Sequence, residues 1–280
     1  MKDKILQEFE GATFTVGMTA QGATLHADQN DVQKVLDYLR DICSVTYVTL
    51  FSDELSTKDA PRLPSNGFKA VTESYGPFTH FHNIIVHAAN SCLTRPRYLK
   101  ALHFYPHNTE MSENLDSERP LKPGVLGLLH SPTPDEPKIS WKDVALIAEV
   151  MSQEGDAINQ LATYARNHLT LDRRRSFFLA IHFNRRMLTL SFLCFHRSGL
   201  SASLPLHLDR EDEFRSIIDH MVGVLTIRDE ASFGFDMTRV GDVYCLNNCR
   251  YDIVCTIQVR KSIRGHATAV YALKCAELLF

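Results

Sequence analysis

Four apolar runs and two amphipathic stretches, in a fixed order between residues 125 and 225, limit most strongly what this chain can fold into. The runs, each of strand length and rich in aliphatic or aromatic residues, are residues 125–130, 141–150, 176–183 and 187–196. The stretches with apolar residues at helical spacing are residues 156–169 and 210–225. The order strand, strand, helix, strand, strand, helix predicts an α/β core whose elements pack in layers.

The regions on either side of this core divide the chain into three predicted parts. Residues 31–42 and 78–94 carry apolar stripes at helical spacing, so residues 1–115 are expected to form a mostly helical extension. The core then occupies residues 116–240. Residues 241–280 are expected to form a β-hairpin.

The composition excludes several classes of protein. Of 280 residues, 44% are hydrophobic and 22% are charged, and the net charge is −3, which is ordinary for a globular chain and not for a disordered or fibrous one. The near-neutral balance argues against a dominant phosphate-binding surface. No apolar run is long enough to cross a bilayer, and the first residues lack a secretory signal. We therefore expect an intracellular protein of the cytoplasm or nucleus, without membrane contact.

The cysteines predict no disulfide framework. There are seven of them, an odd number without C-x-x-C spacing, which is typical of reduced and mostly buried thiols. Cys245 and Cys249 are four residues apart, but no second thiol pair lies nearby in the sequence to close a zinc site.

One set of core residues has the spacing of a metal-dependent active site. Gly124 lies at the entry to the first predicted strand, and Glu149 and Met151 lie two residues apart near the end of the second. Gln160 and Tyr164 are four residues apart on the following helix. This order resembles the PD-(D/E)XK nuclease fold in its RecB-like branch. The resemblance implies a restriction-endonuclease-like mixed sheet flanked by helices, of the α+β or α/β class.

The resemblance also shows what this chain lacks. Active members of that superfamily carry an Asp at the first position, then an acid and a Lys two residues apart. The carboxylates hold a divalent metal ion and the Lys orients the attacking water. Here Gly124 replaces the Asp and Met151 replaces the Lys, neither of which can supply the missing charge. We expect a nuclease-type core that has lost its chemistry, in which Glu149 alone would hold a metal ion only weakly.

A second resemblance covers more of the chain, roughly residues 70 to 270 by its motifs. The segments that carry it occur in a fixed order and are Trp141-Lys142-Asp143-Val144, Phe195-His196-Arg197-Ser198-Gly199 and Phe233-Gly234-Phe235-Asp236. They resemble the region that precedes the catalytic lobe in the fungal-type protein kinase family. That family has an Asp where this chain has His196, and it often reads Lys-Pro-Asp and Glu-x-Lys where this chain has Gly124 and Met151.

The last part of the chain resembles the start of a kinase N-lobe. Residues 262–271 are similar to the family's glycine-rich phosphate loop, which marks Gly265 as a candidate cofactor-binding position. ATP binding at Gly265 would need a complete kinase lobe, and the 280 residues contain neither a His-Arg-Asp nor an Asp-Phe-Gly segment. We therefore expect a truncated lobe without bound cofactor and without phosphoryl transfer. Its hairpin, over residues 252–280, should end in an open-edged strand.

Two clusters of arginine are candidates for contact with nucleic acid. They are placed at the two ends of one predicted strand and comprise Arg173, Arg174, Arg175, Arg185 and Arg186. Short basic runs of this kind are more commonly solvated turns.

Two function classes follow from these patterns. The preferred one is a non-catalytic regulatory or interaction module whose partner is a protein or a kinase lobe. The alternative is a residual nuclease that uses Mg²⁺ or Mn²⁺ and recruits a displaced acid, Asp135 or Glu136, to join Glu149.

Overall fold

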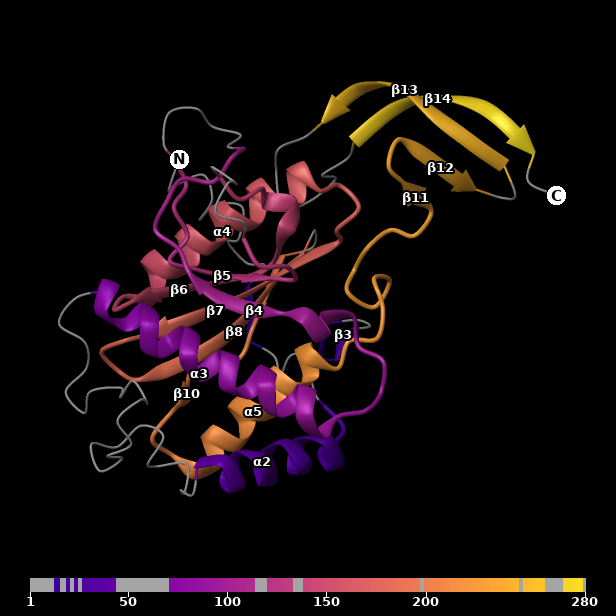
Figure 1. Ribbon diagram of the computed structural model, residues 1–280. Helices are drawn as coiled ribbons and strands as arrows, with labels where there is room; N and C mark the ends of the chain where they lie inside the picture. The colour runs from indigo at the N-terminus through magenta and orange to yellow at the C-terminus, as the bar shows by residue number, and fades with distance from the viewer. Residues whose placement is uncertain are drawn as a thin grey trace.

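A mixed eight-stranded sheet forms the centre of the computed structural model (Figure 1). The structure describes residues 13–15, 19–20, 23–24, 27–43, 71–113, 120–132, 138–196, 199–246, 249–259 and 269–278. The strands run in the order β1-β9-β8-β7-β6-β5-β4, and β10 pairs with β8. Their bounds are β1 (Thr13–Thr15), β4 (His103–Pro106), β5 (Val125–Leu128), β6 (Val144–Met151), β7 (Phe177–Asn184), β8 (Thr189–His196), β9 (Gly199–Ala202) and β10 (Leu206–His207). Thr19–Ala20 (β2) and Ala23–Thr24 (β3) pair separately.

The sheet combines antiparallel pairs with two parallel pairs, β6 with β7 and β1 with β9. β5 is antiparallel to its neighbours β4 and β6, whereas β6 and β7 are parallel. Parallel strands need a long crossover connection, and helix α4 (Glu154–Leu171) provides it. β7 and β8 then form an antiparallel hairpin. The prediction of a mixed sheet with helices is confirmed.

In the described part of the chain, four α-helices cover the two faces of the sheet. Helix α4 packs on one face, while α2 (Gln29–Cys43), α3 (Val71–Cys92) and α5 (Glu211–Leu225) lie on the other (Figure 1). Two separate clusters of buried side chains correspond to these two faces. The single Trp141 is buried in the cluster under α4, in the short 3₁₀ helix η3 (Trp141–Asp143) that leads into β6. A second 3₁₀ helix, η2 (Tyr98–Ala101), precedes β4.

The first 115 residues contribute to the same sheet as the core. β4 pairs with β5, and β1 pairs with β9. Residues of α2 and α3 belong to the same buried cluster as residues of β6, β7 and β8. The predicted division at residue 115 stays a prediction, but the packing across it is continuous.

A second, four-stranded antiparallel sheet follows the main body. Its order is β11-β12-β13-β14, with bounds β11 (Arg239–Val240), β12 (Val243–Leu246), β13 (Cys249–Val259) and β14 (Ala269–Leu278). The predicted hairpin is therefore present as β13 and β14, and β14 lies at an edge of the described sheet. We call these four strands the C-terminal sheet. Figure 1 shows it beside the main body, near the C-terminal end of α4, which leads into β7.

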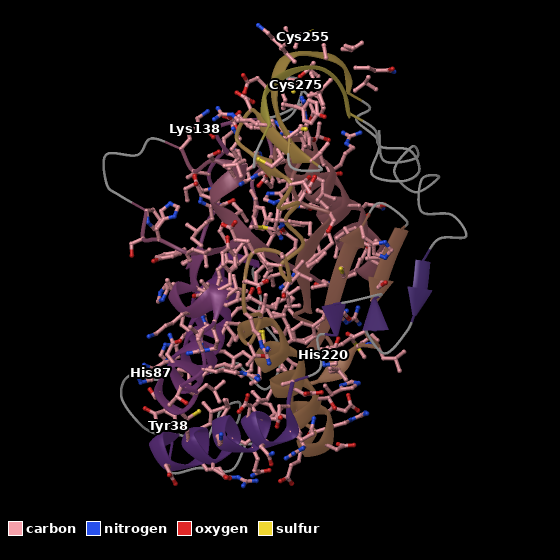
Figure 2. All side chains as sticks on the ribbon, turned by 90° about the vertical axis from the view of Figure 1, so that its right-hand side faces the viewer. Tyr38, His87, Lys138, His220, Cys255 and Cys275 are labelled. Atoms are coloured by element: carbon pink, nitrogen blue, oxygen red, sulfur yellow. The ribbon has the colours of Figure 1, made fainter. Side chains whose placement is uncertain are left out.

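The prediction of mostly buried cysteines is wrong. Of the six cysteines whose side chains the structure describes, only Cys194 is buried. Cys245, Cys255 and Cys275 are exposed because they lie on the C-terminal sheet, which has little protein packed against it. Figure 2 shows Cys255 and Cys275 at the opposite end of the molecule from Tyr38 on α2.

Candidate functional site

Glu149 lies on β6 in the interior of the protein, with 4% of its surface exposed. The antiparallel register of β5 and β6 places Val125 opposite Ala148, so Gly124 and Glu149 are neighbours across the two strands. The Gly124 N–H donates a hydrogen bond to Glu149 Oε2 at 3.3 Å. The strand pairing therefore brings together two of the positions that the sequence singled out.

The environment of Glu149 favours the neutral carboxylic acid. Burial raises the pKa of Glu149 from its ordinary 4.5 to about 8, and the hydrogen bond from Gly124 lowers it only in part. A charged group that leaves water without an ion-pair partner is strongly destabilised. Glu149 is thus protonated at neutral pH, and a protonated acid is a poor ligand for a divalent metal ion.

Tyr75 on α3 fills the space that a side chain at position 124 would need. A Cβ atom on Gly124 would lie 2.7 Å from Tyr75 Cε1 and 2.8 Å from its hydroxyl oxygen. Burial, followed by the nearby Glu149, raises the pKa of the Tyr75 phenol to about 12. The phenol therefore stays neutral, and it fills the space beside Gly124. Sequence analysis did not find Tyr75, because no motif connects it to Gly124 and only the packing of α3 on the sheet does.

Gln160 and Tyr164 tie helix α4 to the entry of β5. Gln160 Nε2 donates to the Tyr164 hydroxyl at 2.5 Å, and that hydroxyl donates to the Lys122 carbonyl oxygen at 3.1 Å. Tyr164 is buried, with its ring centroid 5.8 Å from that of Trp141. Burial, with a smaller contribution from Glu149, raises the pKa of Tyr164 far above its ordinary value. The buried Tyr164 phenol thus lies near Glu149 and is held by hydrogen bonds to α4 and to the entry of β5.

Met151 ends β6 two residues beyond Glu149, so alternation along the strand places both on one face of the sheet. It is half-buried and lies opposite Asn184 of β7. A thioether carries no charge and offers no proton. The positions Gly124, Glu149, Met151, Gln160 and Tyr164 thus fall on two neighbouring strands and one helix, with a single carboxyl group among them.

The structure corrects the prediction for Arg175 as a contact for nucleic acid. Its side chain is 2% exposed, and its guanidinium lies 4.1 Å from the centre of the Phe233 ring. It therefore cannot reach a ligand at the surface. Arg185 and Arg186 lie in the turn between β7 and β8, as predicted. Their role stays a prediction, as do those of Arg173 and Arg174.

Other candidate residues lie outside the described part of the chain. Gly265 is one, and the acids Asp135 and Glu136 are two more. Within the described ranges, no group of three or more His, Cys, Asp or Glu side chains is placed to hold a metal ion. No helix in those ranges is long and apolar enough to span a membrane.

Comparison with known proteins identifies the family. The family model described as fungal protein kinase matches residues 127–278. The chain belongs to the fungal protein kinase family. No curated protein and no solved structure matches it.

The fungal protein kinase match begins inside β5 and ends with β14. It therefore includes both the larger part of the main sheet and the whole C-terminal sheet. Glu149, Met151, Gln160 and Tyr164 lie inside the matched range, whereas Gly124 and Tyr75 precede it. The resemblance to this family that the sequence motifs indicated is confirmed.

Proposed function

We propose that these 280 residues form a non-catalytic regulatory or interaction module for a kinase catalytic lobe of the fungal protein kinase family. Membership of that family supports the kinase connection. The observation that carries the non-catalytic part is the make-up of the Glu149 site, where one buried acid lies beside Gly124 and Tyr75 fills the space next to that glycine. An intracellular location, in cytoplasm or nucleus, belongs to the same proposal.

The proposal includes a degenerate nuclease-type core. The main sheet is mixed and has helices on both faces. Its central elements follow in the chain order α3, β4, β5, β6, α4 and β7, and α4 connects the parallel strands β6 and β7. The relic positions gather where β5, β6 and α4 meet. Tyr75 fills the space beside Gly124, and this replaces a metal ligand by a neutral aromatic ring.

Metal-dependent hydrolysis would need features that this site does not offer. A Mg²⁺ or Mn²⁺ ion requires several oxygen ligands, usually with more than one carboxylate. Deprotonating Glu149 would leave a lone buried charge, and Tyr75 stands where a second ligand would enter. The residual-nuclease alternative would therefore have to bring Asp135 or Glu136 to this place.

A cleavage assay separates the two functions. Purified protein is incubated with DNA and RNA in Mg²⁺ or Mn²⁺, beside Glu149→Gln, which keeps the size of the side chain, and Glu211→Ala, which removes an exposed carboxylate elsewhere. We expect no cleavage above the no-protein background in any sample. Cleavage by the wild type and by Glu211→Ala, but not by Glu149→Gln, would establish the nuclease and overturn the proposal.

The regulatory part needs its own measurement. A catalytic lobe of the same family, one that contains His-Arg-Asp and Asp-Phe-Gly segments, is expressed separately and its phosphoryl transfer is measured with and without this chain. We expect binding and a severalfold change in rate. A lobe that neither binds this chain nor changes its rate at micromolar concentrations would contradict the proposed module.

A further inference from the structure

Three consecutive arginines of the main body contact the C-terminal sheet and the segment that leads to it. Arg173, Arg174 and Arg175 follow the end of α4 and precede β7. Each guanidinium lies near an aromatic ring of the last third of the chain. The arrangement gives the basic run a role that differs from contact with nucleic acid.

Arg175 holds the segment that leads to the C-terminal sheet. Its guanidinium lies against the rings of both Phe233 and Phe235, at 4.1 Å and 4.9 Å from their centres. Main-chain bonds support this contact: Ser176 N–H donates to the Gly234 carbonyl at 2.8 Å, and Asp236 N–H donates to the Arg174 carbonyl at 2.7 Å. Cation–π contacts strengthen when they are removed from water. The contact of Arg175 with Phe233 is buried, so water does not compete with it.

Arg173 contacts the C-terminal sheet directly. Its Nη1 donates to the Tyr271 hydroxyl oxygen on β14 at 3.2 Å and lies 3.4 Å from Thr256 Oγ1 on β13. Arg239 Nη1, from β11, donates to the same Tyr271 oxygen at 2.9 Å. Both guanidiniums also lie over the Tyr271 ring, at 5.7 Å and 5.1 Å from its centre. The Tyr271 hydroxyl thus accepts one hydrogen bond from Arg173 of the main body and one from Arg239 of its own sheet.

The two contacts differ in exposure. Arg175 is buried, whereas Arg173, Arg239 and Tyr271 are only half-buried. An exposed contact of this type contributes little free energy and competes with water. The Tyr271 contact can therefore open while the Phe233–Phe235 segment stays in place.

We propose that Arg173 and Arg175 form a two-point clasp, with Arg175 anchoring the connecting segment and Arg173 reversibly holding the C-terminal sheet through Tyr271. The clasp sets the position of the C-terminal sheet relative to the main sheet. Because Arg173 follows directly from α4, movement of that end of the helix is transmitted to β14. This inference does not depend on the proposed function.

Hydrogen exchange in the full chain tests the clasp. We expect Arg173→Ala to raise the exchange rates of the β13 and β14 amides near Thr256 and Tyr271 about fivefold or more, as local opening becomes easier. Tyr271→Phe should act in the same direction, and the double variant should add little to either single change, because both remove one contact. Arg173→Lys should be intermediate, because Lys keeps the charge and loses the planar fork.

Matched controls keep the result specific. Arg186→Ala removes an exposed arginine from the turn between β7 and β8, and it should leave exchange in β13 and β14 unchanged. The fluorescence of Trp141, the only tryptophan and buried in the main body, should give the same unfolding midpoint for wild type and Arg173→Ala. The clasp is overturned if Arg173→Ala exchanges like Arg186→Ala, or if the Trp141 midpoint falls in parallel with the increase in exchange.

Discussion

At the scale of single residues, the protonation of Glu149 decides the chemical character of the buried site between β5, β6 and α4. An acid with a pKa of about 8 is neutral over most of the physiological range, and its surroundings are a backbone N–H and two neutral phenols. The site is therefore a packed polar cluster. Two predictions concern its individual side chains.

Glu149→Gln should alter the pH dependence of stability. Between pH 4.5 and about 8 the unfolded chain has Glu149 ionised while the folded protein keeps it protonated, so the folded state binds more protons. The contribution of Glu149 to the stability of the wild type therefore falls as pH rises through this window, by up to about 1.4 kcal/mol per pH unit. A Gln side chain does not titrate, so it makes no pH-dependent contribution to stability. Urea unfolding should show the variant gaining on the wild type from pH 5 to pH 8; a constant difference would contradict the assignment.

Gly124→Ala should be destabilising because of Tyr75. The added Cβ would overlap the phenol ring, and overpacking of this kind costs about 1–3 kcal/mol. In a Tyr75→Ala background the same change should cost much less, since the ring is gone. Gly155→Ala is the matched control, because a Cβ there meets nothing within 4 Å. Equal losses in both backgrounds, measured by chemical denaturation, would show that Tyr75 does not fill this space.

At the scale of elements, backbone geometry decides how the main sheet meets the connecting segment. Gly234 has φ +86°, in the left-handed region that favours glycine, and its carbonyl receives both the N–H and the hydroxyl of Ser176. A Cβ there would lie 2.5 Å from Cε1 of Phe177. The segment Phe233-Gly234-Phe235 can take this path only because its centre has no side chain.

Gly234→Ala should therefore loosen the segment more than a comparable change elsewhere. Gly241 also has a positive φ, +60°, but a Cβ there meets nothing within 4 Å. Gly241→Ala carries the conformational penalty of about 1–2 kcal/mol alone, whereas Gly234→Ala adds the overlap with Phe177. Limited proteolysis should cut Gly234→Ala faster near residues 229–236 than Gly241→Ala. Equal cutting of the two variants would refute the close packing described here.

At the scale of the whole molecule, buried neutral histidines make the fold sensitive to acid. His82 and His168 are fully enclosed, and His182 is largely so. Burial lowers the pKa of all three, to about 4 for His82. His82 lies among the rings of Phe78, Phe81 and Phe104; its Nδ1 is 2.9 Å from the Phe78 carbonyl oxygen, and its buried Nε2 has no hydrogen-bond partner among the described residues.

Stability should consequently fall as pH drops below 6.5. In that range the unfolded chain protonates these histidines while the folded protein does not, so the unfolded state binds more protons, and each contributes up to about 1.4 kcal/mol per pH unit. His82→Phe should reduce the loss between pH 6.5 and pH 4.5, whereas replacement of the exposed His130 by Ala should not. Unfolding midpoints in urea at these pH values measure the effect, and an identical acid response in wild type and His82→Phe would disprove it.

The sequence by itself determined the order of the core elements and the family. Apolar runs and helical stripes depend on near neighbours, so the strands from β5 to β8 and the helices α4 and α5 could be located within a few residues. The relative placement of Glu149 and Met151 on one strand, and of Gln160 and Tyr164 on one helix, could also be predicted, because strand alternation and the four-residue helical spacing are local rules. The resemblance to the fungal protein kinase family, which the family model confirms, was indicated by short motifs in a fixed order along the chain.

Only the tertiary structure decided how distant segments meet. Tyr75 beside Gly124, the addition of β4 and β1 to the main sheet, and the enclosure of Arg175 by Phe233 and Phe235 all join residues far apart in sequence. Local sequence patterns carry no information on such contacts. A run of basic residues has the same sequence whether its side chains face water or an aromatic ring. The protonation of Glu149 was hidden for the same reason: a pKa depends on burial, and burial exists only once the chain has folded.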